Sequence, residues 1–91
     1  MTAMLARMNV LDYDAWKPMF DEDPVQARKA AIRHSVYRST EDPNQVFVHV
    51  EFESADEARA AQQRLLDSGL LDRFPDRDGP TIVEIVESVE H

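Results

Sequence analysis

The sequence predicts a single α+β domain over residues 1–91, with strands and helices in the order β-α-β-β-α-β. Three observations lead to this prediction. Apolar residues alternate strictly with other residues at positions 46–53, which is the period of a strand. An amphipathic helical pattern follows at once, behind a capping serine at Ser54. A similar strand-then-helix pattern opens the chain, and an apolar run at residues 81–89 closes it.

The first expected strand covers residues 4–10, because alternate positions there separate into one apolar set and one mixed set. The apolar set is Met4, Ala6, Met8 and Val10, and the other set is Leu5, Arg7 and Asn9. The apolar set suits the face of a sheet that packs against helices.

A broken helix is expected after this strand. Asp12 or Asp14 caps its start, and Trp16, Met19 and Phe20 follow at the spacing of one apolar helix face. The pair Asp23-Pro24 is typical of a second helix start, which predicts one piece at about residues 15–22 and another at about 24–31. The break should tilt the first piece away from the sheet and open a space beneath it.

A hairpin forms the centre of the predicted sheet. Residues 32–40 form a mixed strand, and the turn residues Glu41-Asp42-Pro43-Asn44 connect it to the strand at 46–53. One face of that strand is wholly apolar: Val46, Val48, Val50 and Phe52. The helix that follows begins with the capping-box pair Ser54 and Glu57 and stops at Gly69.

The remaining residues complete a ferredoxin-like arrangement. Residues 70–80 are expected to form a loop, and residues 81–89 the last strand of a four-stranded antiparallel sheet. Helices then cover one face only. The other face carries Phe47, His49 and Glu51. Because exposure of the apolar Phe47 side chain to water is unfavourable, we expect a homodimer in which two such sheet faces pack together.

The amino-acid composition indicates which binding partners and which cellular location to expect. Ten Lys and Arg against eighteen Asp and Glu give a formal charge of −8, which opposes binding to nucleic acid or to an anionic membrane surface. There is no cysteine, so no disulfide or thiolate site is expected, in keeping with a cytoplasmic location. No signal peptide and no membrane-spanning segment are expected from the pattern of apolar residues.

Several segments resemble the dimeric α/β barrel superfamily, which includes antibiotic-biosynthesis monooxygenase-like, small cyclase-like and stress-responsive barrel proteins. The resemblance covers nearly the whole chain and lies in the element order, in VLDYDAWKPMFD, in the hairpin STEDPNQVFVHVEFES and in the helix ADEARAAQQRL. It implies a homodimer whose two sheets form a barrel, and a pocket in each subunit between sheet and helices. Members of this fold catalyse different reactions or none, so the resemblance leaves the reaction open.

Two residues are candidates for catalysis. His34 could transfer protons, because histidine in general can act as an acid or a base near neutral pH, and Tyr37 could orient a ligand through its hydroxyl group. The two have opposite parity on their strand, so they reach one pocket only if a bulge intervenes. Each histidine could equally be a hydrogen-bonded sheet residue. A metal site made by His34, His49 and Glu51 is a weaker alternative, because no short ligand spacing supports it, and we expect no metal and no cofactor.

Five residues are candidates for substrate binding. Trp16 and Phe20 could form an aromatic wall for a flat apolar ligand, although such residues are more often core. Tyr13 could donate a hydrogen bond, and Asn9 could polarise a carbonyl group. Arg73 could lie over the pocket mouth and hold a carboxylate or an enolate, while the alternative for Arg73 is a solvated surface charge.

Two functions remain open. The first is a small cyclase-like or cofactor-independent monooxygenase-like enzyme that acts on an apolar carbonyl or aromatic compound. The second is a non-catalytic dimer that binds a ligand or regulates a partner. An open cavity with converging polar groups would favour the first, and a space filled by Trp16, Met19 and Phe20 would favour the second.

Overall fold

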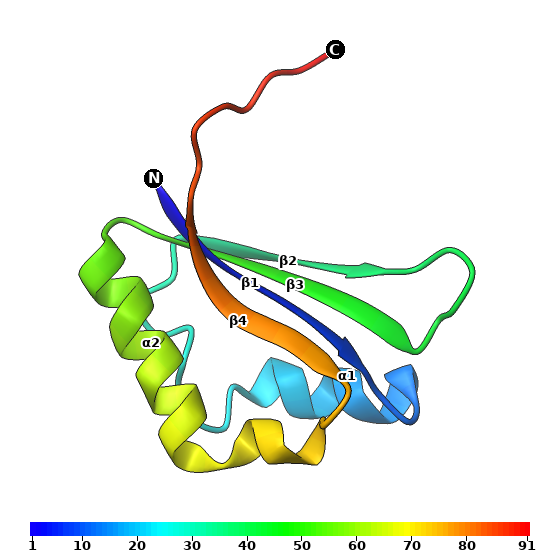
Figure 1. Ribbon diagram of the computed structural model, residues 1–91. Helices are drawn as coiled ribbons and strands as arrows, with labels where there is room; N and C mark the ends of the chain where they lie inside the picture. The colour runs from blue at the N-terminus through cyan, green and yellow to red at the C-terminus, as the bar shows by residue number, and fades with distance from the viewer.

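Four strands form one antiparallel sheet in the order β2-β3-β1-β4 (Figure 1). The computed structural model describes residues 1–91 and confirms the predicted β-α-β-β-α-β order. The strands are β1 (Thr2–Asn9), β2 (Arg33–Arg38), β3 (Gln45–Phe52) and β4 (Arg77–Glu84), and the helices are α1 (Tyr13–Glu22), α2 (Ala55–Ser68) and the short 3-10 helix η1 (Leu70–Arg73). Both α-helices lie on the same face of the sheet, here called the inner face. Neither has the length and apolar character needed to cross a bilayer.

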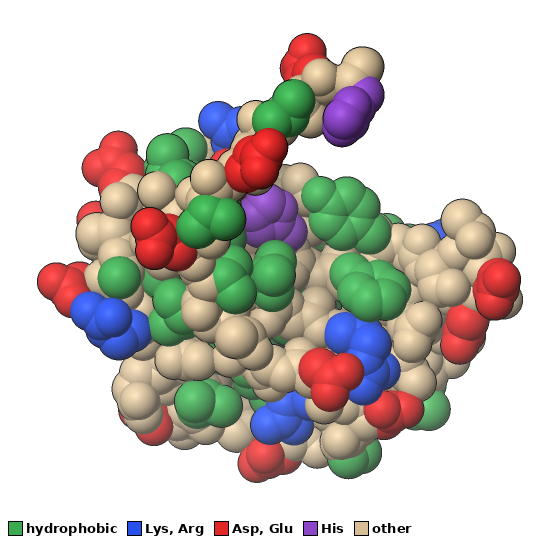
Figure 2. All heavy atoms as spheres, turned by 45° about the horizontal axis from the view of Figure 1, so that its top comes forward, with side chains coloured by type: hydrophobic (Ala, Val, Ile, Leu, Met, Phe, Trp, Pro, Cys, Tyr) green, Lys and Arg blue, Asp and Glu red, His purple; other side chains and the backbone are tan.

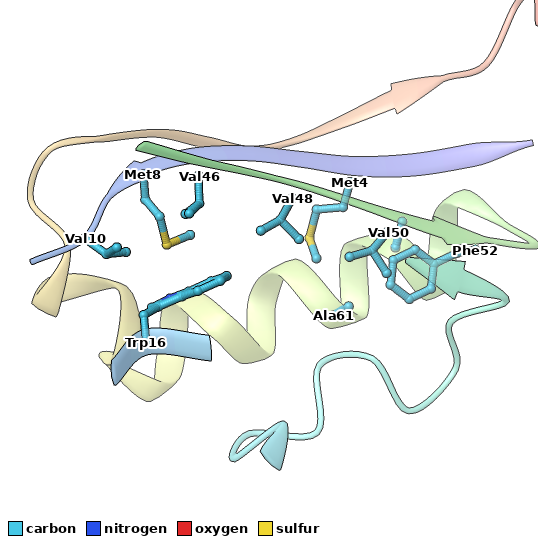
Figure 3. Close-up of a cluster of buried hydrophobic side chains, with 10 residues drawn as sticks. Met4, Met8, Val10, Trp16, Val46, Val48, Val50, Phe52 and Ala61 are labelled. Atoms are coloured by element: carbon cyan, nitrogen blue, oxygen red, sulfur yellow. The ribbon is translucent and has the colours of Figure 1, made fainter. Parts of the chain in front are cut away.

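The core lies between the inner face and the two helices (Figure 3). Antiparallel pairing sets Met4 of β1 opposite Val50 of β3 and Met8 opposite Val46, so the apolar sets of the two central strands share one face. Phe52, at the end of β3, is fully buried. The predicted apolar face of β3 is therefore the floor of the core.

Helix α2 packs closely on the sheet. The Ser54 hydroxyl accepts a hydrogen bond from the Glu57 amide at 3.2 Å, and Gly69 ends the helix with φ +75°, as the sequence predicts. Its buried residues are Ala58 and Ala61. Because alanine side chains are short, the backbone of α2 can approach β1, β3 and β4.

Helix α1 is spaced from the sheet by a large side chain. Asp12 is its N-cap and accepts a hydrogen bond from the Asp14 amide at 3.2 Å. Its one buried residue is Trp16, whose indole ring reaches toward the strands beneath Met8 and Val46 (Figure 3). Trp16 also stacks on Phe20, with ring centroids 4.9 Å apart. Trp16 holds α1 away from the sheet, whereas Ala58 and Ala61 let α2 approach it closely. This difference leaves space beside Trp16.

The expected second helical piece at residues 24–31 is wrong. Asp23 adopts a left-handed conformation (φ +48°) and its amide donates to the Phe20 carbonyl, which ends α1. Gln26 is left-handed as well (φ +54°), so no helix can run through it, and the segment forms successive turns. The Asp23 carboxylate accepts a hydrogen bond from the Arg28 amide at 3.2 Å, which stabilises the turns instead.

The last strand is also shifted from its expected position. It covers Arg77–Glu84 instead of residues 81–89, because it pairs with β1 from Met8↔Arg77 to Thr2↔Glu84 and β1 offers no further partner. The expected loop at residues 70–80 contains η1 and the first residues of this strand. Residues 85–91 extend beyond the sheet, next to the N-terminus at first and then into solvent (Figure 1).

The outer face of the sheet carries no helix. Register places Leu5, Tyr37, Phe47, His49 and Val83 on this face. Figure 2 shows hydrophobic side chains gathered over its middle, with most charged side chains toward the rim. Leu5, Tyr37 and Phe47 are large apolar or aromatic residues that are exposed to water.

Candidate functional site

A cavity of about 90 Å³ lies between the inner face of the sheet and the helices. Most of the residues around it are apolar. Its walls come from α1 and the turns after it, from α2, and from η1 with the residue that follows it. The sheet contributes residues of β1, β3 and β4: Met4, Ala6, Met8, Val48, Val50, Arg77 and Pro80. The sequence-based expectation of a space beneath α1 is met, because Trp16, Met19 and Phe20 border the cavity without filling it.

The size of the cavity limits what it can hold. An engineered apolar cavity of about 150 Å³ admits benzene, so a cavity of 90 Å³ must enlarge by movement of its lining side chains before it admits a molecule of that size. Ligand pockets of drug size have volumes of roughly 300–1,000 Å³. Three flexible methionines, Met4, Met8 and Met19, line the cavity and can change rotamer as a ligand enters.

Three charged side chains line this apolar space: Asp23, Arg28 and Arg77. Arg77 is the first residue of β4 and pairs with Met8, so its side chain lies on the inner face. Its Nη1 donates to the carbonyl oxygens of Leu71 at 2.9 Å and Phe74 at 3.3 Å. These two bonds anchor the guanidinium group to η1.

The Nε atom of Arg77 is buried and has no hydrogen-bond partner in the protein. A buried donor left unpaired costs about 1–3 kcal/mol, and more when it belongs to a charged group. Arg77 also forms no ion pair, although Asp76 and Asp78 flank it in the sequence. Strand alternation explains this, because both carboxylates reach Arg7 on the outer side, at 3.1 and 2.7 Å.

Arg28 lies at the rim of the cavity. Its guanidinium group stacks over the Phe20 ring at 3.8 Å from the centroid and donates to the Phe20 carbonyl oxygen. Its Nε lies 3.6 Å from the Asp23 carboxylate. Unlike Arg77, Arg28 is therefore already paired with an acidic group.

Of the three expected binding residues that are aromatic and lie on α1, Trp16 and Phe20 border the cavity. Trp16 is 5% exposed and belongs both to the core and to the cavity wall, and Phe20 stacks on it. Tyr13 lies next to Trp16, with ring centroids 5.9 Å apart, and Arg38 covers its ring at 4.4 Å. Tyr13 does not line the cavity.

Asn9 and Arg73 lie elsewhere. The Asn9 amide donates to Asp76 at 2.6 Å and its oxygen accepts from Arg7 at 3.2 Å, in the charged cluster at the start of β4. Arg7 donates hydrogen bonds to Asp78 and Asp76, which raise the pKa of Arg7 above its usual value, and the bond to Asp78 has the larger effect. Arg7 therefore stays charged. Arg73 is exposed on η1 and does not line the cavity, so it does not lie over the pocket mouth.

The two candidate catalytic residues do not share a site. His34 pairs with Val50 and faces inward, whereas Tyr37 pairs with Phe47, faces outward and is 52% exposed. No bulge interrupts this register. The His34 ring meets the edge of Phe20 at 5.6 Å between centroids, and its Nε2 lies 3.4 Å from Arg28 Nη1, which places His34 just outside the cavity rim.

The alternative metal site is excluded by the same register. His49 pairs with Ser35 on the outer face and its Nε2 lies 3.9 Å from Glu51, while His34 is on the inner face. The two histidines therefore lie on opposite sides of the sheet. No group of three His, Cys, Asp or Glu side chains is arranged to hold a metal ion.

Sequence reasoning missed Arg77 and Arg28 as site residues. It proposed an arginine at the cavity and chose Arg73, while it placed both Arg73 and Arg77 in the expected loop at residues 70–80, among alternating charges. In the structure β4 already begins at Arg77, and Arg77 pairs with Met8. A strand residue that pairs with Met8 lies on the same face as Met8, so Arg77 is on the inner face. The usable signal was the alternation Asp76, Arg77, Asp78, which has the period of a strand.

The element order, sheet order and one-sided helices define a ferredoxin-like fold. Among solved structures, a mutant of SnoaB, a cofactor-independent oxygenase from Streptomyces nogalater, matches 99% of this chain and 97% of its own chain. The TM-score is 0.70 and the sequence identity is 13%. Similarity at this level of identity shows the fold. No protein-family model matches the sequence, and no curated protein matches it.

Proposed function

We propose that this protein is a small enzyme that binds an apolar carbonyl or aromatic compound in the inner cavity and converts it without a cofactor. The observation that carries the proposal is the cavity itself, an apolar space with charged groups at its wall, on the fold of a cofactor-independent oxygenase. The reaction class is oxygenation or cyclisation, both of which start by removing a proton next to a carbonyl group.

In this proposal His34 is the proton acceptor. It is exposed just outside the cavity rim, against Phe20 and Arg28, so those two side chains must move before it reaches a bound ligand. In oxygenation, one CH2 group and one O2 molecule give one C=O group and one water, and the substrate supplies the electrons. In cyclisation the carbanion attacks a second carbonyl group of the same molecule, and no O2 is consumed.

The test uses purified protein with a panel of small ketones, 1,3-diketones and phenols. Thermal shift measures binding, an oxygen electrode measures O2 uptake, and mass spectrometry identifies products. We expect His34→Ala to reduce turnover about 100-fold or more, as removal of a general base does. His49→Ala removes the histidine of the outer face and serves as the matched control. Failure of every compound to bind, or unchanged turnover in His34→Ala, refutes the proposal.

A non-catalytic binding protein is the second candidate, and one observation favours it. The cavity wall contains no His, Tyr, Ser or Thr, and its one carboxylate, Asp23, is opposed by Arg28. A ligand that binds but is recovered unchanged, under air and over many hours, would support this candidate.

We further propose that the protein is a homodimer joined through its outer sheet faces. Leu5, Tyr37 and Phe47 expose apolar surface there, around a hollow that also includes His49 and Val83. A second copy would cover this surface, and two sheets packed face to face are a common arrangement. Sedimentation should give twice the monomer mass, and Leu5→Arg should yield monomers. A wild-type protein that sediments as a monomer at all concentrations refutes this proposal.

A further inference from the structure

We propose that Arg77 Nε is a receptor for an anionic oxygen, so that the cavity selects a small apolar compound bearing a carboxylate or an enolate. This inference rests on the proposed function, because it names the class of ligand for the same cavity. Its basis is independent of the fold comparison: a buried, unpaired donor on a charged side chain that lines an apolar space. The donor itself is covered in this structure, so a ligand oxygen reaches it only when flexible lining side chains such as Met8 move aside.

The position of Arg77 is fixed from two sides. Its backbone pairs with Met8 in the sheet, and its Nη1 is bound by the carbonyl oxygens of Leu71 and Phe74. A guanidinium group held in this way keeps its own position while the side chains that cover Nε move, and hydrogen bonds between two charged partners are the strong ones.

Charge favours an anion over a neutral ligand. Arg77 forms no ion pair in a chain whose formal charge is −8, because the neighbouring Asp76 and Asp78 bind Arg7 on the other face of the sheet. The second arginine of the cavity, Arg28, is already opposed by Asp23. An anionic oxygen at Arg77 Nε would therefore satisfy both an unpaired donor and an unpaired charge.

Volume restricts the rest of the ligand. A cavity of 90 Å³ is smaller than the one that admits benzene, so the apolar body has about four or five carbon atoms. Two kinds of compound present the required oxygen at this size. One is a short branched carboxylate, and the other is a small 1,3-dicarbonyl compound that ionises to its enolate.

The test compares three probes of similar size: 3-methylbutanoate, pentane-2,4-dione and the neutral ketone 4-methylpentan-2-one. Binding is followed by calorimetry and by the ¹⁵N–¹H resonance of the Arg77 Nε–H group, neither of which needs catalysis. We expect an anionic probe to bind at least about tenfold more tightly than the neutral ketone and to shift the Arg77 resonance. The pH dependence of dione binding separates the enolate from the carboxylate.

Two variants complete the test. Arg77→Lys keeps the charge but removes the Nε donor, and it should weaken anion binding about tenfold or more. Arg73→Lys, at an exposed position outside the cavity, should leave binding unchanged. If Arg77→Lys does not fold, the Arg77 resonance of the unmodified protein decides alone: a shift with anionic probes supports the proposal, and no shift overturns it. If the ketone binds as tightly as the anions, the inference fails and the proposed function survives. If no probe binds, the inference fails, and the proposed function fails with it only when every compound of its own panel also fails to bind.

Discussion

The same substitution at two positions of β3 should have very different effects on stability. Phe52 and Phe47 lie on one strand but on opposite faces, and they are 0% and 38% exposed. Replacing Phe52 by Ala removes a fully buried ring from the inner face, where α2 covers the sheet. Replacing Phe47 by Ala removes a ring that water already reaches.

The expected cost for Phe52→Ala is about 3–5 kcal/mol, which combines lost burial with the cavity left behind. A chain of 91 residues has a free energy of unfolding of about 5–14 kcal/mol. The change therefore removes a large part of the stability, and the melting temperature should fall by on the order of 20 °C. Phe47→Ala should cost less than about 1 kcal/mol in the monomer.

Urea unfolding followed by circular dichroism measures both values, at several protein concentrations. In the proposed dimer, Phe47→Ala would make the midpoint depend less on concentration, because it weakens association and not the monomer. Equal destabilisation by the two variants at the lowest concentration would show that the assignment of inner and outer faces is wrong.

Three further substitutions test local features. Ser54→Ala should cost about 1 kcal/mol by removing the N-cap of α2, and Ser54→Thr, which keeps the hydroxyl, should recover most of it in the same unfolding assay. Gly79→Ala should destabilise by about 1–3 kcal/mol, because a Cβ there would lie 2.6 Å from the Leu5 carbonyl oxygen at a φ of +88°; a variant as stable as wild type would contradict this backbone. Arg28→Lys loses the flat stack on Phe20, so amide exchange should become several-fold faster in residues 23–31 and stay unchanged in α2; uniform acceleration in both regions would refute a local role.

Local sequence signals were sufficient for the central strand and the second helix. The alternation of β3, the Ser54 cap and the Gly69 stop each depend on only a few neighbouring residues. They can therefore be predicted without knowledge of the rest of the fold. The one-sided placement of the helices also follows from the element order. These elements form the floor and one wall of the cavity.

Features that depend on residues far away in the chain could not be predicted from local sequence patterns. The start of β4 at Arg77 is fixed by the residues of β1 that are free to pair, and these lie about seventy positions away in the chain. The left-handed conformations of Asp23 and Gln26 likewise replace an expected helix by turns that Arg28 stabilises. Both errors fell on the cavity wall, since Arg77 and the turns after α1 line the cavity.

Trp16 has a consequence for measurement. It is the only tryptophan in the chain, and its buried indole borders the cavity. Its fluorescence therefore originates from one site, without contributions from other indoles to subtract. Tyr13, with its ring 5.9 Å away, can pass excitation to it. Any molecule that enters beside the indole changes the polarity that the emission senses, so the unlabelled protein carries an optical probe for its own ligand.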